Sequence, residues 1–562
     1  MHVAITTLLL LLATTLSSLL SRASGMKLPL PLLQIAFGVL IALSGHGLQL
    51  EPDVFMLLFI PPLLFADAYV IPLRELRRLK GIVLALAIGL VLFSTLACGW
   101  FIHWLQPGVP LAAGFALAAV LSPTDAVAVG SLLEGGGAPR RMMHILSGEA
   151  LLNDATGLVC FRFAVAAAMA GGFSAPRAGL AFLAMSAGGI AAGAALAWIA
   201  LRGTAWLMRR NLDDPPAHVT LIVLLPFAAY LAAERLHASG ILAAVAAGLM
   251  VNRFGTASLN SRLRMSHGEV WPMIGFVFNG IIFLLLGVQL PGIVEHAVAL
   301  SRQLALPLWR LPATIVLITV ALTLLRLLWI RSMLVVRLAR QHLRGEVAPV
   351  PQFRLSVALA VAGVRGAITL AAVLSLPVPS GGTPGSPIDV GAAPGFPYRD
   401  LLVTEAAGVI ICSLLLAALL LPLLLRHARA PAADPLPREI EDARVTLAQA
   451  AIAAVEQYRD RAPADDEEAA GIADAILGEQ HERLARLEQA PERDGGLDRD
   501  SVLRRHRRSS ALRLRALRSR RDALQGLWHS QAINNEALHE IQRELDHEEA
   551  MLLDEARLVA RA

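Results

Sequence analysis

Thirteen long apolar runs, separated by short polar segments, occupy most of the first 430 of the 562 residues, and they constrain the fold more than any other feature. A helix needs about 20 mostly apolar residues to cross the hydrocarbon core of a bilayer. The runs lie near residues 3–21, 28–46, 54–71, 81–104, 111–133, 145–171, 177–208, 217–234, 238–252, 270–290, 311–336, 353–377 and 400–425. The sequence therefore predicts an all-α polytopic membrane protein with about thirteen transmembrane helices.

Charge divides the chain into two parts. Residues 1–430 hold 29 Lys and Arg and 17 Asp and Glu, whereas residues 431–562 hold 20 and 27. We expect a transmembrane domain over 1–430, with the lipid bilayer as its partner, and a charged helical tail over 431–562 with a regulatory role. The basic residues of the first part lie between apolar runs rather than in one stripe, so no nucleic-acid partner is expected.

Basic residues also predict the orientation of the spans, because cytoplasmic loops carry an excess of Lys and Arg. With the N-terminus outside, 17 Lys and Arg fall in inside loops and 5 in outside loops. This asymmetry predicts a multi-pass protein of the inner (plasma) membrane with an external N-terminus and a cytoplasmic tail. A signal peptide is the alternative for the first run, but its positive charges follow the apolar stretch, which favours a retained helix.

Seven of the ionisable side chains within the predicted spans are candidate functional residues. A charge in the hydrocarbon core is costly unless it is paired or hydrated, so each of them marks a candidate functional position. They are Asp67, Asp125, Glu149, Asp154, Arg162, Arg326 and Arg365. Such a set is typical of a transporter for a small charged species and is too small for a voltage sensor.

The fifth span is interrupted by Ser122-Pro123-Thr124-Asp125. Pro123 lacks an amide hydrogen and opposes the preceding turn, so these residues predict a helix that is broken at mid-membrane. Freed carbonyl groups and half-helix ends bind ions in secondary transporters. A simple proline kink, with the serine satisfying the backbone, explains the motif equally well.

In the sixth span, Glu149 and Asn153 share a helical face, whereas Asp154 is rotated about 100° from Asn153. The two carboxylates therefore point in different directions and are expected to have different roles. A lone aspartate in a membrane span favours ion handling for Asp154. A structural ion pair fits Glu149 at least as well.

The twelfth span places Arg365 between Gly363 and Gly366. Glycines permit a local break, and a buried arginine requires a carboxylate partner. The interruptions fall in spans five and twelve, as corresponding members of two inverted six-helix repeats would show. On this interpretation the seventh span connects the repeats.

Together these motifs resemble the monovalent cation:proton antiporter family, which contains bacterial NhaP-type antiporters and animal sodium/proton exchangers. The resemblance covers residues 1 to about 425 and does not include the tail. The segments that match, in the family's order, are Pro61-Pro62-Leu63-Leu64-Phe65, Ser122-Pro123-Thr124-Asp125, Gly148-Glu149 with Asn153-Asp154, Phe276 to Asn279 with Phe283 and Gly287, and Val364-Arg365-Gly366-Ala367.

The resemblance implies thirteen helices in an inverted repeat, two crossing broken helices, and a homodimer in which a core domain moves against a dimerisation domain. It also implies that Asp154 alternately takes a cation, such as Na⁺, or a proton. Asn153 lies beside it, and relatives with this Asn-Asp pair tend to be electroneutral. Because burial disfavours a charged carboxylate, proton and cation are expected to compete at Asp154.

The same resemblance assigns further residues to the site. Ser122, Thr124 and Asp125 match the unwound-helix motif and are expected to help bind the cation, and Arg365 matches an arginine that pairs with the glutamate at Glu149. Two departures concern the ligands: Ala66 stands where many members carry a carboxylate, with Asp67 one place later as an accessory acid, and Ala150 stands where a serine ligand is frequent.

The predicted function is exchange of a monovalent cation for H⁺, with Na⁺ as the first candidate and pH and sodium homeostasis as the physiological role. Exchange of K⁺ or Li⁺ on the same scaffold is the near alternative. A membrane-embedded enzyme or a channel is a remote one, since the spans contain no metal-spaced His pair and no nucleophile with a base. No cofactor is expected.

The tail carries a basic block between Arg504 and Arg521, with Leu514, Leu517, Leu524 and Trp528 close to helical spacing. One hypothesis is an interfacial helix on anionic lipid. A solvated helical bundle or dimer contact, with the basic block facing acids such as Glu536, Glu540 and Glu544, is favoured over it.

Overall fold

The structure is a computed structural model that forms two compact units, Met1–Ala430 and Pro431–Ala562, each described by itself below. The described residues are 2–24, 29–45, 52–133, 139–170, 175–210, 214–258, 261–303, 307, 309–344, 352–377, 396, 398–426, 435–461, 467–488 and 515–527, with seven further residues between 530 and 549.

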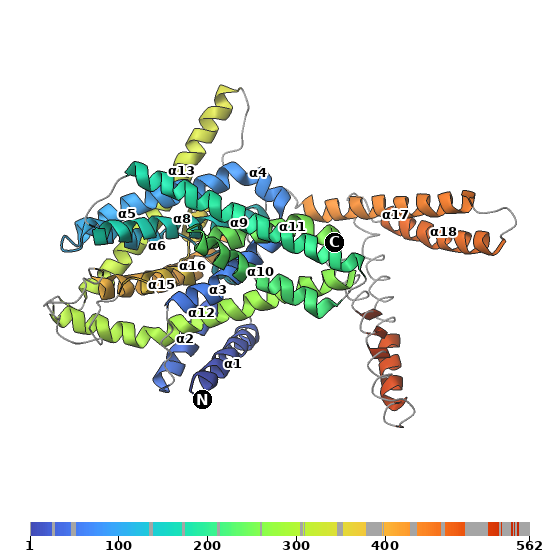
Figure 1. The fold of residues 1–562 in the computed structure, drawn as a ribbon, viewed down its shortest axis with the longest axis horizontal. Helices are drawn as coiled ribbons and strands as arrows, with labels where there is room; N and C mark the ends of the chain where they lie inside the picture. The colour runs from blue at the N-terminus through green and yellow to red at the C-terminus, as the bar shows by residue number, and fades with distance from the viewer. Residues whose placement is uncertain are drawn as a thin grey trace. The chain divides into compact units, whose positions relative to one another are not determined.

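Every regular element in these residues is a helix (Figure 1). In the first unit they are α1 (His2–Ala23), α2 (Leu30–Leu43), α3 (Pro52–Val70), α4 (Leu73–Leu84), the π-helical turn η1 (Ala85–Leu90), α5 (Val91–Leu105), α6 (Leu111–Leu121), α7 (Ala126–Leu133), α8 (Arg140–Ala170), α9 (Ala175–Arg209), α10 (Pro215–Arg235), α11 (Gly240–Ser258), α12 (Ser261–Gln303), α13 (Arg310–Leu343), α14 (Phe353–Val361), α15 (Ala367–Leu374) and α16 (Arg399–Leu425).

Helices occupy all thirteen apolar ranges predicted from the sequence, which confirms the all-α polytopic fold class. Among the described residues, eight helices are long and apolar enough to cross a bilayer, and the bent pair α6 and α7 makes a ninth if it crosses as one span. The count of thirteen spans and the inverted repeat remain predictions.

Two of the helical ranges are broken where the sequence predicted it. α6 ends at Leu121 and α7 begins at Ala126, with a bend of 43° between them. α14 ends at Val361 and α15 begins at Ala367. Proline in the first break, and glycines in the second, explain why the helical hydrogen bonds stop there.

Close contacts are densest within two sets of helices. In one set, α2 packs along α12, and α11 packs against α3, α9 and α10. In the other, α6 packs against α5 and α8, and α16 packs against α13 and α14. α8 makes few close contacts with α9, α10 and α11. The sets are therefore only loosely joined along this side of α8.

The closest crossing in the first set is between α2 and α12. A Cβ atom on Gly38 would lie 2.9 Å from the Cα atom of Gly287, so only glycine fits at this crossing. The position of Gly287 in the family-like segment is thus explained by backbone contact.

In the second set, α13 is fixed against the π-helical turn. Trp329 donates a hydrogen bond of 3.1 Å from its indole nitrogen to the carbonyl oxygen of Ala85, and its ring packs against Gly89 and Phe93. Trp329 lies one turn after Arg326, so this contact also sets the direction in which Arg326 points.

The second unit contains α17 (Pro435–Arg461) and α18 (Glu467–Glu488), which pack side by side. Residues 515–527 are also helical, and Leu517 and Leu524 pack with Leu545. Arg520 and Arg521 of the basic block pair with Glu548 and Glu549 at 2.6 and 2.5 Å. These ion pairs support the hypothesis of a solvated bundle in which basic and acidic segments face each other.

Several residues used in the tail hypotheses lie outside the described residues. They are Arg504, Leu514, Trp528, Glu536 and Glu540.

Candidate functional site

The two helix breaks lie against each other. The backbone N–H of Asp125 donates to the carbonyl oxygen of Val364 at 2.8 Å, so the two interrupted chains are hydrogen-bonded at the crossing. The Thr369 hydroxyl donates to the carbonyl oxygen of Val120 at 3.0 Å. Backbone groups that the breaks leave unpaired within their own helices are thus satisfied between the helices, as buried polar groups must be.

Asp125 occupies the position before α7 and caps that helix. Its Oδ1 atom accepts hydrogen bonds from the backbone N–H groups of Val127 and Ala128, at 2.9 and 3.0 Å. These are orphan donors of the first helical turn, which an aspartate at this position satisfies well. Gly366 lies directly against the Asp125 side chain: a Cβ atom there would be 2.6 Å from the Asp125 Cβ atom.

Asp154 lies on α8, the helix that packs against the first break. Three residues later and on the same face, Gly157 contacts Pro123 so closely that a Cβ atom would lie 2.8 Å from the Pro123 Cδ atom. The Asp154 side chain is half-buried. A partly exposed carboxylate therefore lies on the helix that packs against the unwound segment.

α3, which carries Asp67, packs against α8, and Asp125 lies in the helix break against which α8 packs. Asp67 is exposed although its neighbours Ala66 and Ala68 are buried. Asp67, Asp125 and Asp154 therefore lie on α8 and on elements that contact it. No three His, Cys, Asp or Glu side chains in the described part of the chain are close enough to hold a metal ion.

Asn153 begins a buried chain of polar side chains. Its Nδ2 atom donates to the Thr124 hydroxyl at 3.0 Å, and this hydroxyl donates to Glu149 Oε1 at 3.3 Å. The Asn153 Oδ1 atom is buried and accepts no hydrogen bond from the residues that the structure describes. Thr124 is thus placed by two side chains of α8, while one amide oxygen next to Asp154 stays unused.

Glu149 forms an ion pair with Arg326 of α13. The guanidinium donates from Nη2 to Glu149 Oε2 at 2.7 Å and from Nη1 to Glu149 Oε1. A third bond joins Arg326 Nε to the carbonyl oxygen of Leu359 at 3.0 Å. Both side chains are almost fully buried, with 1% and 2% exposed. Each of the three guanidinium nitrogens thus donates to an acceptor, as a buried charge requires.

The predicted pairing of Glu149 with Arg365 is therefore wrong. Arg365 lies in the second helix break, where it donates from Nε to the carbonyl oxygen of Leu121 at 2.9 Å and from Nη1 to that of Gly363. The physical reason is that each break leaves carbonyl groups without helical partners, and Arg365 is placed to bind one from each helix. Arg326 was recognised in the sequence as a charge within a span, but spacing gave no reason to prefer it.

Ser122 has a more local role in the geometry than its sequence motif suggested. Its hydroxyl donates to the carbonyl oxygen of Ala118 at 2.7 Å, one turn back in α6, and lies 3.5 Å from the Thr95 hydroxyl. A serine hydroxyl that bonds to the carbonyl oxygen four residues earlier competes with the backbone hydrogen bonds of the helix and helps to bend it. Ser122 therefore contributes to ending α6 at the break.

Comparison with known proteins identifies the family. A family model described as sodium/hydrogen exchanger, transmembrane, matches residues 8–427. The chain belongs to this family. It is a multi-pass membrane protein and a monovalent cation/proton antiporter, which places it among transporters rather than enzymes.

Individual relatives agree with the family match. The chain is 40% identical to the uncharacterized Na(+)/H(+) exchanger YjcE of Escherichia coli K12, over 99% of this chain and 100% of that one. It is 34% identical to a sodium, potassium, lithium and rubidium/H(+) antiporter of Bacillus pumilus, over 97% of this chain and 77% of the relative.

Among solved structures, the sodium proton antiporter MjNhaP1 of Methanocaldococcus jannaschii aligns with a TM-score of 0.52 and 18% identity, over 76% of this chain and 99% of that one. This likeness supports the fold of the transmembrane unit.

Proposed function

We propose that the chain exchanges Na⁺ for H⁺, one for one, at the carboxylate of Asp154. The observation that carries this proposal is the placement of a half-buried Asp154 against the break between α6 and α7, beside the buried Asn153. A carboxylate that is taken partly out of water is poorly stable as a free anion. Either a proton or a cation neutralises it, so the two ligands compete.

The neighbouring groups supply oxygen atoms of the kind that Na⁺ prefers. The Asn153 Oδ1 atom accepts no hydrogen bond within the described residues, and the Thr124 hydroxyl accepts one from the Asn153 Nδ2 atom. In this proposal Asp154, Asn153 and Thr124 contribute to the cation site, Ser122 and Asp125 shape the break around it, and Asp67 is an accessory acid on the solvent-accessible side.

Electroneutral exchange is proposed because Asp154 stands beside an amide rather than beside a second carboxylate. Asp125, the other carboxylate at the break, already accepts two backbone hydrogen bonds as the cap of α7. One titrating carboxylate in the site then carries one proton in one direction and one cation in the other.

A second candidate is exchange of several alkali cations. The relative from Bacillus pumilus, which is named for sodium, potassium, lithium and rubidium, matches almost the whole of this chain. Ala150 in place of a serine ligand leaves a less complete oxygen shell, which favours weak discrimination among cations of different size.

We further propose a homodimer in the inner membrane, with an external N-terminus and a role in pH and sodium homeostasis.

The test is proton efflux from everted vesicles, followed with a pH-sensitive dye on addition of Li⁺, Na⁺, K⁺ or Rb⁺ across a pH series. Na⁺-driven efflux that is insensitive to an imposed membrane potential is expected for the wild type. Efflux of similar size with every cation would instead establish the second candidate.

Asp154→Asn is expected to abolish the response while the protein still elutes as a folded species in detergent. Asp400→Asn, which changes an exposed carboxylate whose ion pair within the described residues is with Arg399, is the matched control and should keep full exchange. Cation-dependent proton flux in the Asp154→Asn variant would refute the site.

A further inference from the structure

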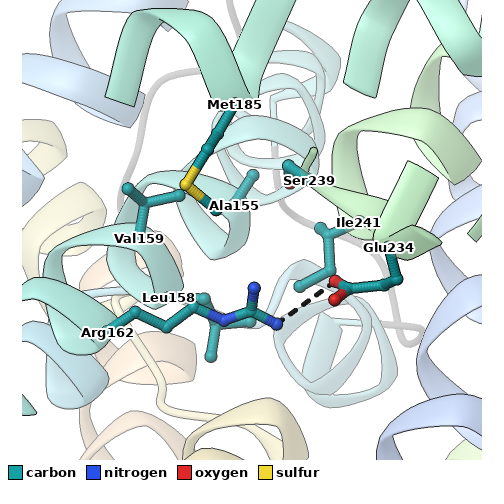
Figure 2. Close-up of a pocket in the computed structure, with 8 residues that line it drawn as sticks. All are labelled: Ala155, Leu158, Val159, Arg162, Met185, Glu234, Ser239 and Ile241. Carbon is teal, nitrogen blue, oxygen red and sulfur yellow. Dashed lines mark hydrogen bonds and ion pairs between the residues drawn. The ribbon is translucent and has the colours of Figure 1, made fainter. Parts of the chain in front are cut away.

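We propose that the ion pair between Arg162 and Glu234 is a gate that closes the predicted outer side of the path to Asp154. Arg162 Nη2 lies 3.2 Å from Glu234 Oε1 and donates a hydrogen bond to it (Figure 2). This inference rests on the proposed role of Asp154, because it concerns access to that residue.

The pair lies at one edge of a small pocket that leads back along α8. Three successive turns of α8 line the pocket with Ala155, Leu158 and Arg162, and Ala155 is the residue after Asp154 (Figure 2). From Arg162 to Asp154 is eight residues, or about 12 Å along the helix axis. The pocket therefore connects the ion pair with the neighbourhood of the proposed cation site.

The opposite wall belongs to the other set of helices. Glu234 is at the end of α10, and Ser239 lies just before α11; both line the pocket together with Met185 of α9. The backbone N–H of Ser239 donates to the carbonyl oxygen of Met185 at 3.0 Å. In the turn between α10 and α11, His237 takes a left-handed conformation with φ of 53°. This wall is held together by its own hydrogen bonds.

α8 and this wall touch only sparsely apart from the ion pair, because α8 packs mainly on α4, η1 and α6. An interface with little shared packing is one along which two helix sets can separate. When Arg162 and Glu234 are paired, their side chains bridge that interface at the edge of the pocket. When they part, the pocket opens toward the side on which α8 ends and α10 ends, which the positive-inside rule predicts to be external.

The exposure of the pair suits a contact that is made and broken. The side chains are 46% and 33% exposed, so separating them leaves both charges in contact with water. The Glu149–Arg326 pair, at 1% and 2%, would leave buried charges if it opened. α8 is thus anchored permanently to α13 by one ion pair and reversibly to α10 by the other.

The experiment measures access to a pocket residue directly. Leu158→Cys, placed in a Cys160→Ala background so that its peptide carries one thiol, is exposed to a membrane-impermeant thiol reagent in right-side-out and in everted vesicles. Modification at position 158 is read by mass spectrometry. Labelling from the outer side is expected to be slow with the pair intact and to rise about two- to fivefold with Glu234→Gln or Arg162→Gln, the range that a partly exposed ion pair supports.

Two further variants separate gating from a general loss of structure. The charge swap Arg162→Glu with Glu234→Arg restores the pair in reverse and is expected to return labelling toward the starting rate. Glu75→Gln, which removes the 3.3 Å pair with Arg78 on α4 away from the pocket, is expected to leave labelling unchanged. Unchanged labelling in both single variants, or no recovery in the swap, would overturn the proposal.

The labelling is repeated in Asp154→Asn, which lacks the proposed exchange site. The response to Glu234→Gln is expected to persist there, because it reports access and not turnover. Exchange that survives in Asp154→Asn would therefore refute the proposed site and leave the labelling result standing, whereas absent labelling changes would refute the gate alone.

Discussion

Glu149 of α8 and Arg326 of α13 face each other in a buried two-point ion pair, and Glu149 also accepts a hydrogen bond from Thr124 in the first helix break. These contacts connect α13, through α8, to the first helix break. Arg326 holds Glu149, Glu149 holds Thr124, and Thr124 is bound in turn by Asn153, the neighbour of Asp154. The position of the unwound segment therefore depends on an ion pair one turn of α8 away from the proposed cation site.

Removing one partner of this pair is expected to be severely destabilising. Arg326→Gln leaves the Glu149 carboxylate buried without its counter-ion, a change that lowers the free energy of unfolding by about 3 to 5 kcal/mol. The measurement is thermal unfolding of the purified protein in detergent. Glu75→Gln, which breaks the exposed pair with Arg78, is the control and should cost less than about 1 kcal/mol.

Arg365→Gln distinguishes the observed pairing from the one predicted by resemblance. Because Arg365 donates to backbone carbonyl groups and not to Glu149, its loss should lower the unfolding temperature less than the loss of Arg326. A larger effect from Arg365→Gln than from Arg326→Gln would show that the hydrogen bonds of Arg365 to the helix breaks matter more for stability than the ion pair of Glu149.

The sequence predicted the elements whose causes are local. Pro123 removes a helical hydrogen bond and the glycines beside Arg365 permit a local break, so both breaks could be predicted. The alternation of basic loops with apolar runs located the helices. Ion-pair partners have no local cause. Whether Glu149 meets Arg326 or Arg365 depends on how α13 packs, which is set by Trp329 against the π-helical turn.

Asp125 shows an intermediate case. Its role as the cap of α7 follows from a residue pattern, an aspartate directly before a new helix, but it becomes visible only when the start of that helix at Ala126 is known. The Arg162–Glu234 pair was harder to predict from the sequence than the Asp125 cap. Arg162 was recognised as a charge within a span, but the pattern gave no indication that α10 would bring a carboxylate to it.

The contact between α8 and the first break gives a third prediction. Gly157→Ala places a methyl group where Pro123 already lies, so α8 must shift away from the unwound segment. Overpacking of this kind costs about 1 to 3 kcal/mol, and we expect a large loss of exchange because Asp154 moves with α8. Proton efflux from everted vesicles and thermal unfolding are the two measurements.

Gly275→Ala on α12 is the matched control for Gly157→Ala. A Cβ atom at Gly275 has no neighbour within 4 Å, so alanine there is expected to keep exchange and to stabilise the helix slightly. Equal activity of the two variants would show that the close contact between Gly157 and Pro123 is not needed for transport.

A fourth prediction concerns a buried carboxyl group on α16. Glu405 of α16 is fully buried, and its Oε1 atom accepts a hydrogen bond from Gln106 Nε2 at the end of α5. The Glu405 Oε2 and Gln106 Oε1 atoms are also buried, and neither has a hydrogen-bond partner among the described residues. If the Oε2 atom of residue 405 were replaced by an amide nitrogen, its N–H group could donate to Gln106 Oε1. Both buried atoms would then take part in a hydrogen bond.

Glu405→Gln supplies that N–H group and is therefore expected to match or exceed the wild type in unfolding temperature. Gln106→Ala removes the hydrogen bond that Gln106 donates to Glu405, and it should lower the free energy of unfolding by about 1 to 3 kcal/mol, the cost of an unsatisfied buried polar group. Thermal unfolding at neutral pH compares the two. If Glu405→Gln destabilises as strongly as Gln106→Ala, the carboxylate itself is required, and Glu405 acts through its charge rather than through this hydrogen bond.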